Sequence, residues 1–152
     1  KDLIAVSPDV GSIKMARAYA KRVSAGLAII DKRRVSPEKA EAMHIMGEVE
    51  GKNVIIIDDM IATGSSLIEA VGALKKAKAK AIYAAITHGI LSGPAIERID
   101  QCKGLEKLLI SDSVPLSAEK QHEKIQVLSV ASLLAEAIKR IHNEESVSCL
   151  FD

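Results

Sequence analysis

Short, continuous apolar runs recur along this chain and alternate with helix-like segments. The clearest run is Val54-Ile55-Ile56-Ile57, which is β-branched throughout, and strands are also predicted over 3–6, 27–30, 81–87, 105–111 and 124–128. Helices are predicted over 12–24, 67–78, 94–101 and 130–142. The pattern of residues 38–50 does not distinguish between helix, strand and loop. Continuously apolar strands that alternate with helices are typical of a parallel sheet covered on both sides. We therefore predict an α/β fold with a mostly parallel sheet and helices on both faces.

The composition fits one soluble domain and excludes several classes of function. No internal repeat or low-complexity linker divides the 152 residues, so we predict a single domain over 1–152. A net charge of +1 and 2% aromatic residues argue against nucleic acid and against an anionic membrane surface as partners. Two distant cysteines, Cys102 and Cys149, argue against a disulfide scaffold or a structural zinc site. The apolar runs are too short to cross a membrane and no signal peptide opens the chain, so we expect a cytoplasmic location.

Polar clusters follow four of the predicted strands, at 7–12, 31–34, 58–66 and 87–94. In an open parallel sheet the C-terminal ends of the strands lie at one edge, and ligands bind there. We therefore expect these clusters to converge.

The segment 58–66 carries the most chemical information. Asp58 and Asp59 end the strongest strand, and Thr63-Gly64-Ser65-Ser66 leads into a helix. Backbone N–H groups at a helix N-terminus, with hydroxyls beside them, bind a phosphate monoester. Adjacent carboxylates accept hydrogen bonds from vicinal ribose hydroxyls or help to hold Mg²⁺. The segment suits a phosphorylated pentose. The alternative is that the two aspartates only terminate the strand and that Thr63 or Ser65 only caps the helix.

These residues carry a family resemblance. Segment 54–66 resembles the phosphoribosyl diphosphate binding motif of the type I phosphoribosyltransferase fold. Further segments resemble, in order along the whole chain, the ribose-phosphate diphosphokinases (phosphoribosyl diphosphate synthetases): 7–17, 31–34, 47–52, 87–95 and 145–151. The chain departs from the family pattern at Ser12, Met15, Val35 and Ala62 and in the run Gly64-Ser65-Ser66. Its Ala62-Thr63-Gly64 loop resembles the transferase pattern as much as the synthetase pattern. Phosphate binding is expected to survive these departures because it rests on backbone N–H groups.

The resemblance implies the C-terminal half of a two-domain enzyme whose N-terminal half supplies much of the ATP pocket. A chain that opens inside a strand fits this expectation. The family transfers the diphosphoryl group of ATP to ribose 5-phosphate, with Mg²⁺, and yields phosphoribosyl diphosphate and AMP. It is expected to act as a homo-oligomer.

The resemblance also implies roles for individual residues. Lys32 and Arg34 match the catalytic pair, whose cations would stabilise the diphosphoryl group in transfer, with Arg33 in support. By composition alone, that run is a solvated surface loop. Asp9 matches a metal-binding position, and capping of the following helix is an equally weighted interpretation. The ribose 5-phosphate site would consist of Asp58, Asp59, Ala62, Thr63, Gly64, Ser65 and Ser66. An allosteric site for phosphate and nucleoside diphosphates would include Ser146, Ser148 and Phe151.

Two alternatives remain from the sequence. A small phosphoribosyltransferase would consume phosphoribosyl diphosphate, but it needs a hood over a nucleobase, for which no aromatic cluster or long insertion is present. A non-catalytic synthetase-associated subunit would keep the fold without turnover. Ser12 and Ala62 favour that alternative, whereas Lys32, Arg34, Asp58 and Asp59 oppose it.

Overall fold

The computed structural model describes residues 2–33 and 42–151 and contains a seven-stranded sheet in the order β3-β2-β1-β4-β5-β6-β7. All neighbouring strands are parallel except β2 and β3, which are antiparallel. The strands are β1 (Leu3–Ser7), β2 (Gly26–Arg33), β3 (Ala42–Met46), β4 (Asn53–Ile61), β5 (Ala81–Gly89), β6 (Lys107–Ser111) and β7 (Ile125–Leu128). The helices are α1 (Ile13–Arg22), α2 (Ser65–Lys76), α3 (Ala95–Gln101) and α4 (Ala131–His142), with 3₁₀ turns at Ala118–Lys120 and Ser148–Leu150.

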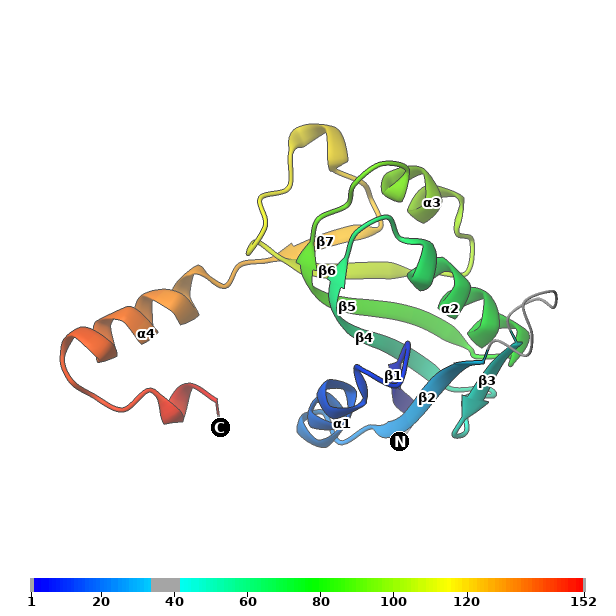
Figure 1. Cartoon of the computed structure of the whole chain (residues 1–152), viewed down its shortest axis with the longest axis horizontal. Coiled ribbons are helices and arrows are strands. Elements are labelled where there is room, and N and C mark those ends of the chain that lie inside the picture. Colours follow the sequence, from blue (N-terminus) through cyan, green and yellow to red (C-terminus); the bar gives the residue numbers. More distant parts are fainter. Residues whose placement is uncertain (1, 34–41, 152) are drawn as a thin grey trace.

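Helices cover both faces of the sheet, as the strand pattern predicts (Figure 1). On one face Ala16 and Ala20 of α1 pack against Ala5 and Ile57. On the other face α2 and α3 enclose the larger core, which includes the completely buried residues Leu74, Ile99 and Leu108. Each such aliphatic side chain contributes about 1.5–3 kcal/mol through its removal from water. The α/β fold with a mostly parallel sheet is therefore confirmed.

Every predicted strand and helix is present, and two boundaries differ in a way that affects the site. The strand β2 runs to Arg33, so Lys32 and Arg33 lie in a strand and the prediction of a loop there is wrong. The cause is the antiparallel partner β3, formed from the ambiguous segment, which pairs Met43 with Lys32. The strand β4 runs to Ile61 because β5 continues beside it and pairs Gly89 with Ile61.

The last helix does not pack on the sheet. Figure 1 shows α4 extending away from the body of the protein, and the chain then turns back toward α1. The guanidinium of Arg22 in α1 donates a hydrogen bond to the carbonyl of Phe151. Four large apolar side chains of α4 are between 44% and 67% exposed, namely Leu133, Leu134, Ile138 and Ile141. No helix in the described part of the chain is long and apolar enough to cross a membrane.

Candidate functional site

Three of the four predicted polar clusters meet at the C-terminal edge of the sheet. The Ser12 hydroxyl donates to Asp58 Oδ1 at 2.8 Å, which joins the segment after β1 to the end of β4. The backbone N–H of Ser92 donates to the Ala62 carbonyl at 2.9 Å, which joins the segment after β5 to the same loop. The fourth cluster begins at the end of β2, which is parallel to β1. Arg34 lies outside the described residues.

A cavity of about 210 Å³ opens between these segments. Its volume is below the range of drug-sized pockets and suits one small ligand. Acidic side chains, the β4–α2 loop and the first turn of α2 all contribute to its lining. Its lining comprises Pro8, Asp9, Ile56, Asp58, Met60, Ile61, Ala62, Thr63, Gly64, Ser65, Ser66, Leu67 and Ile86.

The β4–α2 loop is short and presents a free helix N-terminus. Gly64 precedes the first residue of α2 and has a φ of +77°, a left-handed conformation that favours glycine. No side chain caps the helix, so the interpretation of Thr63 or Ser65 as its cap is wrong. Their hydroxyls instead lie 3.2 Å from each other. The first N–H groups of a helix have no acceptor within it, and the helix dipole makes this end positive. The loop therefore suits an anion such as a phosphate group.

The two adjacent aspartates have different surroundings. Asp58 is half-buried, lines the cavity, and accepts hydrogen bonds from the Ser12 hydroxyl and from the Asp59 N–H at 3.0 Å. Burial is the main cause that raises the pKa of Asp58, and the negative charges of Asp59 and Asp9 act in the same direction. Asp59 is exposed and is not among the residues that line the cavity. Both lie inside β4, so the interpretation that they terminate the strand is wrong.

Asp9 contacts the backbone just before α1 and lines the cavity, while its metal-binding role stays a prediction. One carboxylate oxygen accepts a hydrogen bond of 2.9 Å from the Ser12 N–H, immediately before α1. The same side chain lines the cavity, as does the β4–α2 loop. Ser12 therefore connects both acidic side chains, through its N–H to Asp9 and through its hydroxyl to Asp58.

The donor set of the cavity fits a cation such as Mg²⁺ only in part. In the described ranges, no group of three or more His, Cys, Asp or Glu residues could hold a metal ion. Mg²⁺ commonly takes one or two carboxylates and completes its coordination with water and substrate phosphates. Asp9 and Asp58 fit that smaller requirement.

Two polar contacts at this edge had no signal in the sequence. Arg98 of α3 donates from Nη1 to the Thr63 carbonyl at 2.8 Å, although it lies 35 residues away along the chain. His88 lies 2.8 Å from the Ser113 hydroxyl through Nδ1. Contacts between distant segments depend on the completed fold, and no local pattern announces them.

The remaining predicted residues lie elsewhere. Ser146, Ser148 and Phe151 follow α4, and the Ser148 N–H donates to the Ser146 hydroxyl at 3.2 Å. None of them lines the cavity. The backbone of Lys32 is part of β2, and its side chain is not described.

Comparisons with known proteins agree with this architecture. A family model described as a phosphoribosyl synthetase-associated domain matches residues 33–152. The ribose-phosphate pyrophosphokinase of Oceanobacillus iheyensis is 52% identical over 99% of this chain and 47% of its own length. That of Caldanaerobacter subterraneus is 51% identical, again over 99% of this chain and 47% of its own length. The chain thus spans about half the length of the curated relatives it matches.

Solved structures also include a phosphoribosylpyrophosphate synthetase that resembles this chain. The phosphoribosylpyrophosphate synthetase of Mycobacterium smegmatis matches with a TM-score of 0.86 and 34% identity, over 95% of this chain and 46% of that chain. An APRTase from Giardia lamblia matches with a TM-score of 0.54 and 19% identity, over 68% of this chain and 65% of that chain, which shows the fold alone. Neither the phosphoribosyltransferase alternative nor the non-catalytic subunit is favoured by these comparisons.

Proposed function

The chain belongs to the phosphoribosyl synthetase family, and on that premise we propose that it forms the ribose 5-phosphate-binding, C-terminal half of a ribose-phosphate diphosphokinase. The observation that carries the proposal is the cavity whose lining combines the first turn of α2, the positive end of that helix, with the carboxylates of Asp9 and Asp58. A sugar phosphate has the matching polarity, with a dianionic group at one end and hydroxyl donors at the other.

The proposed reaction belongs to the whole enzyme. The anomeric hydroxyl oxygen of ribose 5-phosphate bonds to the β-phosphorus of ATP and loses its proton. The bond between that phosphorus and the oxygen bridging to the α-phosphate breaks, and AMP leaves. Positioning and charge stabilisation supply most of the catalysis in such phosphoryl transfers.

The residues of this chain would divide that work. The N–H groups and hydroxyls of Thr63, Gly64, Ser65 and Ser66 would hold the 5-phosphate, with the backbone of Ala62 beside them. The carboxylate of Asp58, with Asp59 next to it, would accept hydrogen bonds from the ribose hydroxyls. Lys32 and Arg34 would stabilise the negative charge on the diphosphoryl group.

Asp9, together with Asp58, would hold Mg²⁺. Bound Mg²⁺ neutralises phosphate charge and orients the transferred group. The whole enzyme would take ATP mainly from its N-terminal half and would act as a homo-oligomer. Its allosteric site for phosphate and nucleoside diphosphates would use Ser146, Ser148 and Phe151.

Calorimetric titration of this chain with ribose 5-phosphate tests the binding proposal. We expect binding that inorganic phosphate displaces, and much weaker binding of free ribose. Gly64→Ala should weaken the binding of both ribose 5-phosphate and inorganic phosphate, because alanine is strained at a φ of +77°. Gly72→Ala is the matched control, since a methyl group there meets no other atom within 4 Å. No heat and no competition at millimolar ligand would overturn the proposal.

The catalytic assignment needs a full-length enzyme that carries this sequence. We expect Lys32→Ala and Arg34→Ala each to lower turnover by roughly a hundredfold to a thousandfold, with little change in the Michaelis constants, because their charges act mainly in the transition state. Arg33→Ala should have a much smaller effect. Steady-state kinetics with both substrates varied measures this. A rise in the Michaelis constants at unchanged turnover would instead indicate a binding patch.

A further inference from the structure

Three consecutive carbonyl groups, of Ile61 at the end of β4 and of Ala62 and Thr63 in the β4–α2 loop, accept hydrogen bonds from one segment, 90–98. The Ile61 carbonyl accepts the N–H groups of Ile90 at 3.0 Å and Leu91 at 3.2 Å. The Ala62 carbonyl accepts the Ser92 N–H at 2.9 Å. The Thr63 carbonyl accepts Nη1 of Arg98 at 2.8 Å, whereas the donors described above for the other two carbonyls are backbone N–H groups.

These contacts fix the direction of the loop N–H groups. In a planar trans peptide the C=O of one residue and the N–H of the next point in opposite directions. Because the carbonyls of residues 61, 62 and 63 point toward segment 90–98, the N–H groups of residues 62, 63 and 64 point away from it. The cavity lies on that other side, since its lining includes the loop and no residue of segment 90–98.

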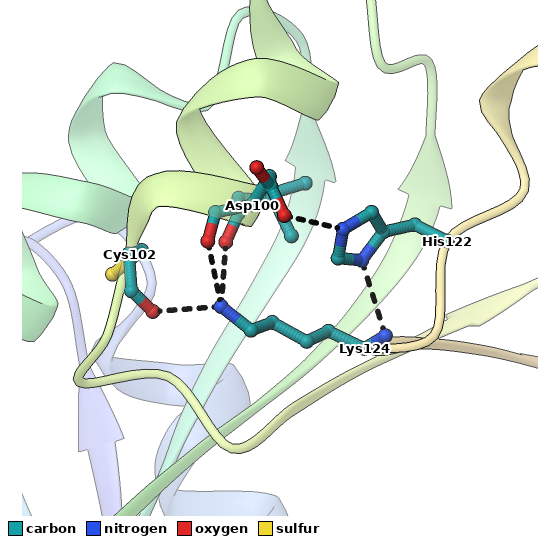
Figure 2. A network of polar contacts seen from close by, with 5 residues as sticks. Asp100, Cys102, His122 and Lys124 are labelled. Atoms are coloured by element: carbon teal, nitrogen blue, oxygen red, sulfur yellow. Dashed lines mark hydrogen bonds and ion pairs between the residues drawn. The ribbon is translucent and has the colours of Figure 1, made fainter.

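The helix that carries Arg98 is firmly held. Ala95 and Ile99 of α3 are completely buried in the main core. Lys124 caps the C-terminus of α3 (Figure 2). The ammonium group of Lys124 donates hydrogen bonds to the carbonyls of Ile99, Asp100 and Cys102 at 3.0–3.1 Å. A cation that satisfies the last carbonyls of a helix stabilises that end. Arg98 therefore reaches the loop from a rigid support.

We propose that Arg98 is a positioning residue for phosphate binding: its hydrogen bond to the Thr63 carbonyl holds the Gly64 N–H toward the anion. Arg98 does not itself line the cavity, so it acts through the peptide that it orients. The proposal rests on the proposed function, because it presupposes a phosphate group in this cavity. It assigns a role in the site to a residue of α3, outside the β4–α2 loop.

Calorimetry with two probes, inorganic phosphate and ribose 5-phosphate, tests the proposal. Arg98→Met keeps the length of the side chain and removes its donors, and we expect affinity for both probes to fall by the same factor, about tenfold. Arg98→Lys, which keeps a donor and the charge, should restore most of the affinity. Lys139→Met, at an exposed residue of α4, removes the same charge elsewhere and should bind both probes as the parent does.

Hydrogen exchange of the ligand-free protein supplies a second measurement. In Arg98→Met the Ser92 amide, which donates to the Ala62 carbonyl of the loop, should exchange faster, whereas the amides of Leu74 and Ile99 should keep the parent rates. Failure of the parent protein to bind either probe would overturn the proposed function. Binding by the parent with unchanged affinity in Arg98→Met, or a loss confined to ribose 5-phosphate, would overturn the role of Arg98 alone.

Discussion

Two strand–helix units of this protein, β4–α2 and β7–α4, share one sequence pattern and differ in what covers the helix. Each has an amphipathic helix of 12 residues that follows a parallel strand after a short connection. In α2 the apolar residues Leu67, Ala70, Val71 and Leu74 are no more than 5% exposed. In α4 the apolar residues Leu133, Leu134, Ile138 and Ile141 are at least 44% exposed.

The difference separates what periodicity specifies from what tertiary contacts specify. An apolar stripe predicts a helix and the face that needs cover, but it does not name the covering surface. The helix α2 returns over the sheet and thereby presents its N-terminus to the cavity. The helix α4 leaves the sheet, as Figure 1 shows, so the candidate site is built without it.

The largest expected effect tests this contrast in packing. Leu74→Ala in α2 should reduce the free energy of unfolding by about 2–5 kcal/mol, because it leaves a cavity at a completely buried position. Ile138→Ala in α4 should change it by less than about 0.5 kcal/mol, because that side chain is 67% exposed. Urea unfolding of both variants measures the difference. Equal losses would mean that α4 is covered in solution, and the contrast would be lost.

The contrast also marks how far sequence patterns could predict this molecule. The apolar runs predicted the strands, and the rule for parallel sheets predicted that Ser12, Asp58 and Ser92 would meet at one edge. The loop 62–64 was also predictable, because its N–H groups and glycine are adjacent along the chain. These features depend on local sequence or on one general rule of topology.

Features that depend on pairing between distant segments could not be predicted. The extension of β4 to Ile61 requires β5 beside it, and the inclusion of Lys32 in β2 requires the antiparallel strand β3. The contact between Arg98 and Thr63 spans 35 residues. The different surroundings of Asp58 and Asp59 likewise appear only once α1 has placed Ser12 beside one of them.

The next prediction compares the loop of the β4–α2 unit with the interior of its helix. Gly64→Ala should cost about 1–2 kcal/mol of stability, because alanine is strained in the left-handed conformation. Gly72→Ala should gain about 0.5–1 kcal/mol, because alanine is favoured inside a helix and the site is open. Thermal unfolding monitored by circular dichroism distinguishes them. A stable Gly64→Ala variant with unchanged phosphate affinity would show that the loop conformation is not required.

Ser12 allows a comparison within the site itself, since its N–H donates to Asp9 and its hydroxyl donates to Asp58. Ser12→Ala removes the donor to Asp58, and we expect affinity for ribose 5-phosphate to fall by about threefold to tenfold while affinity for inorganic phosphate is unchanged. Ser92→Ala is the matched control, because Ser92 contacts the loop through its backbone N–H. An equal loss for both ligands would contradict the division of the cavity into two ends.

The smallest expected effect concerns the charge of Asp58, the one carboxylate of the β4–α2 unit that lines the cavity. Burial raises the pKa of Asp58, so the folded protein holds its proton more tightly than the unfolded chain does. The stabilisation linked to that proton is fully present below the ordinary carboxyl pKa of about 4 and is lost as the pH rises through the raised pKa. Asparagine does not ionise, so Asp58→Asn does not lose stability as the pH rises. The variant should therefore melt at a slightly higher temperature than the parent at pH 7, and the difference should shrink toward pH 4. Glu123→Gln removes an exposed carboxylate and controls for the change in net charge. Scanning calorimetry of the three proteins across this range measures the difference, and a lower melting temperature for Asp58→Asn at pH 7 would show that the ionised carboxylate stabilises the fold.

The same substitution should weaken ribose 5-phosphate binding, because an amide is a poorer acceptor for the sugar hydroxyls than a carboxylate is. A gain in stability together with a loss of binding would identify Asp58 as a residue kept for the ligand at a cost to the fold.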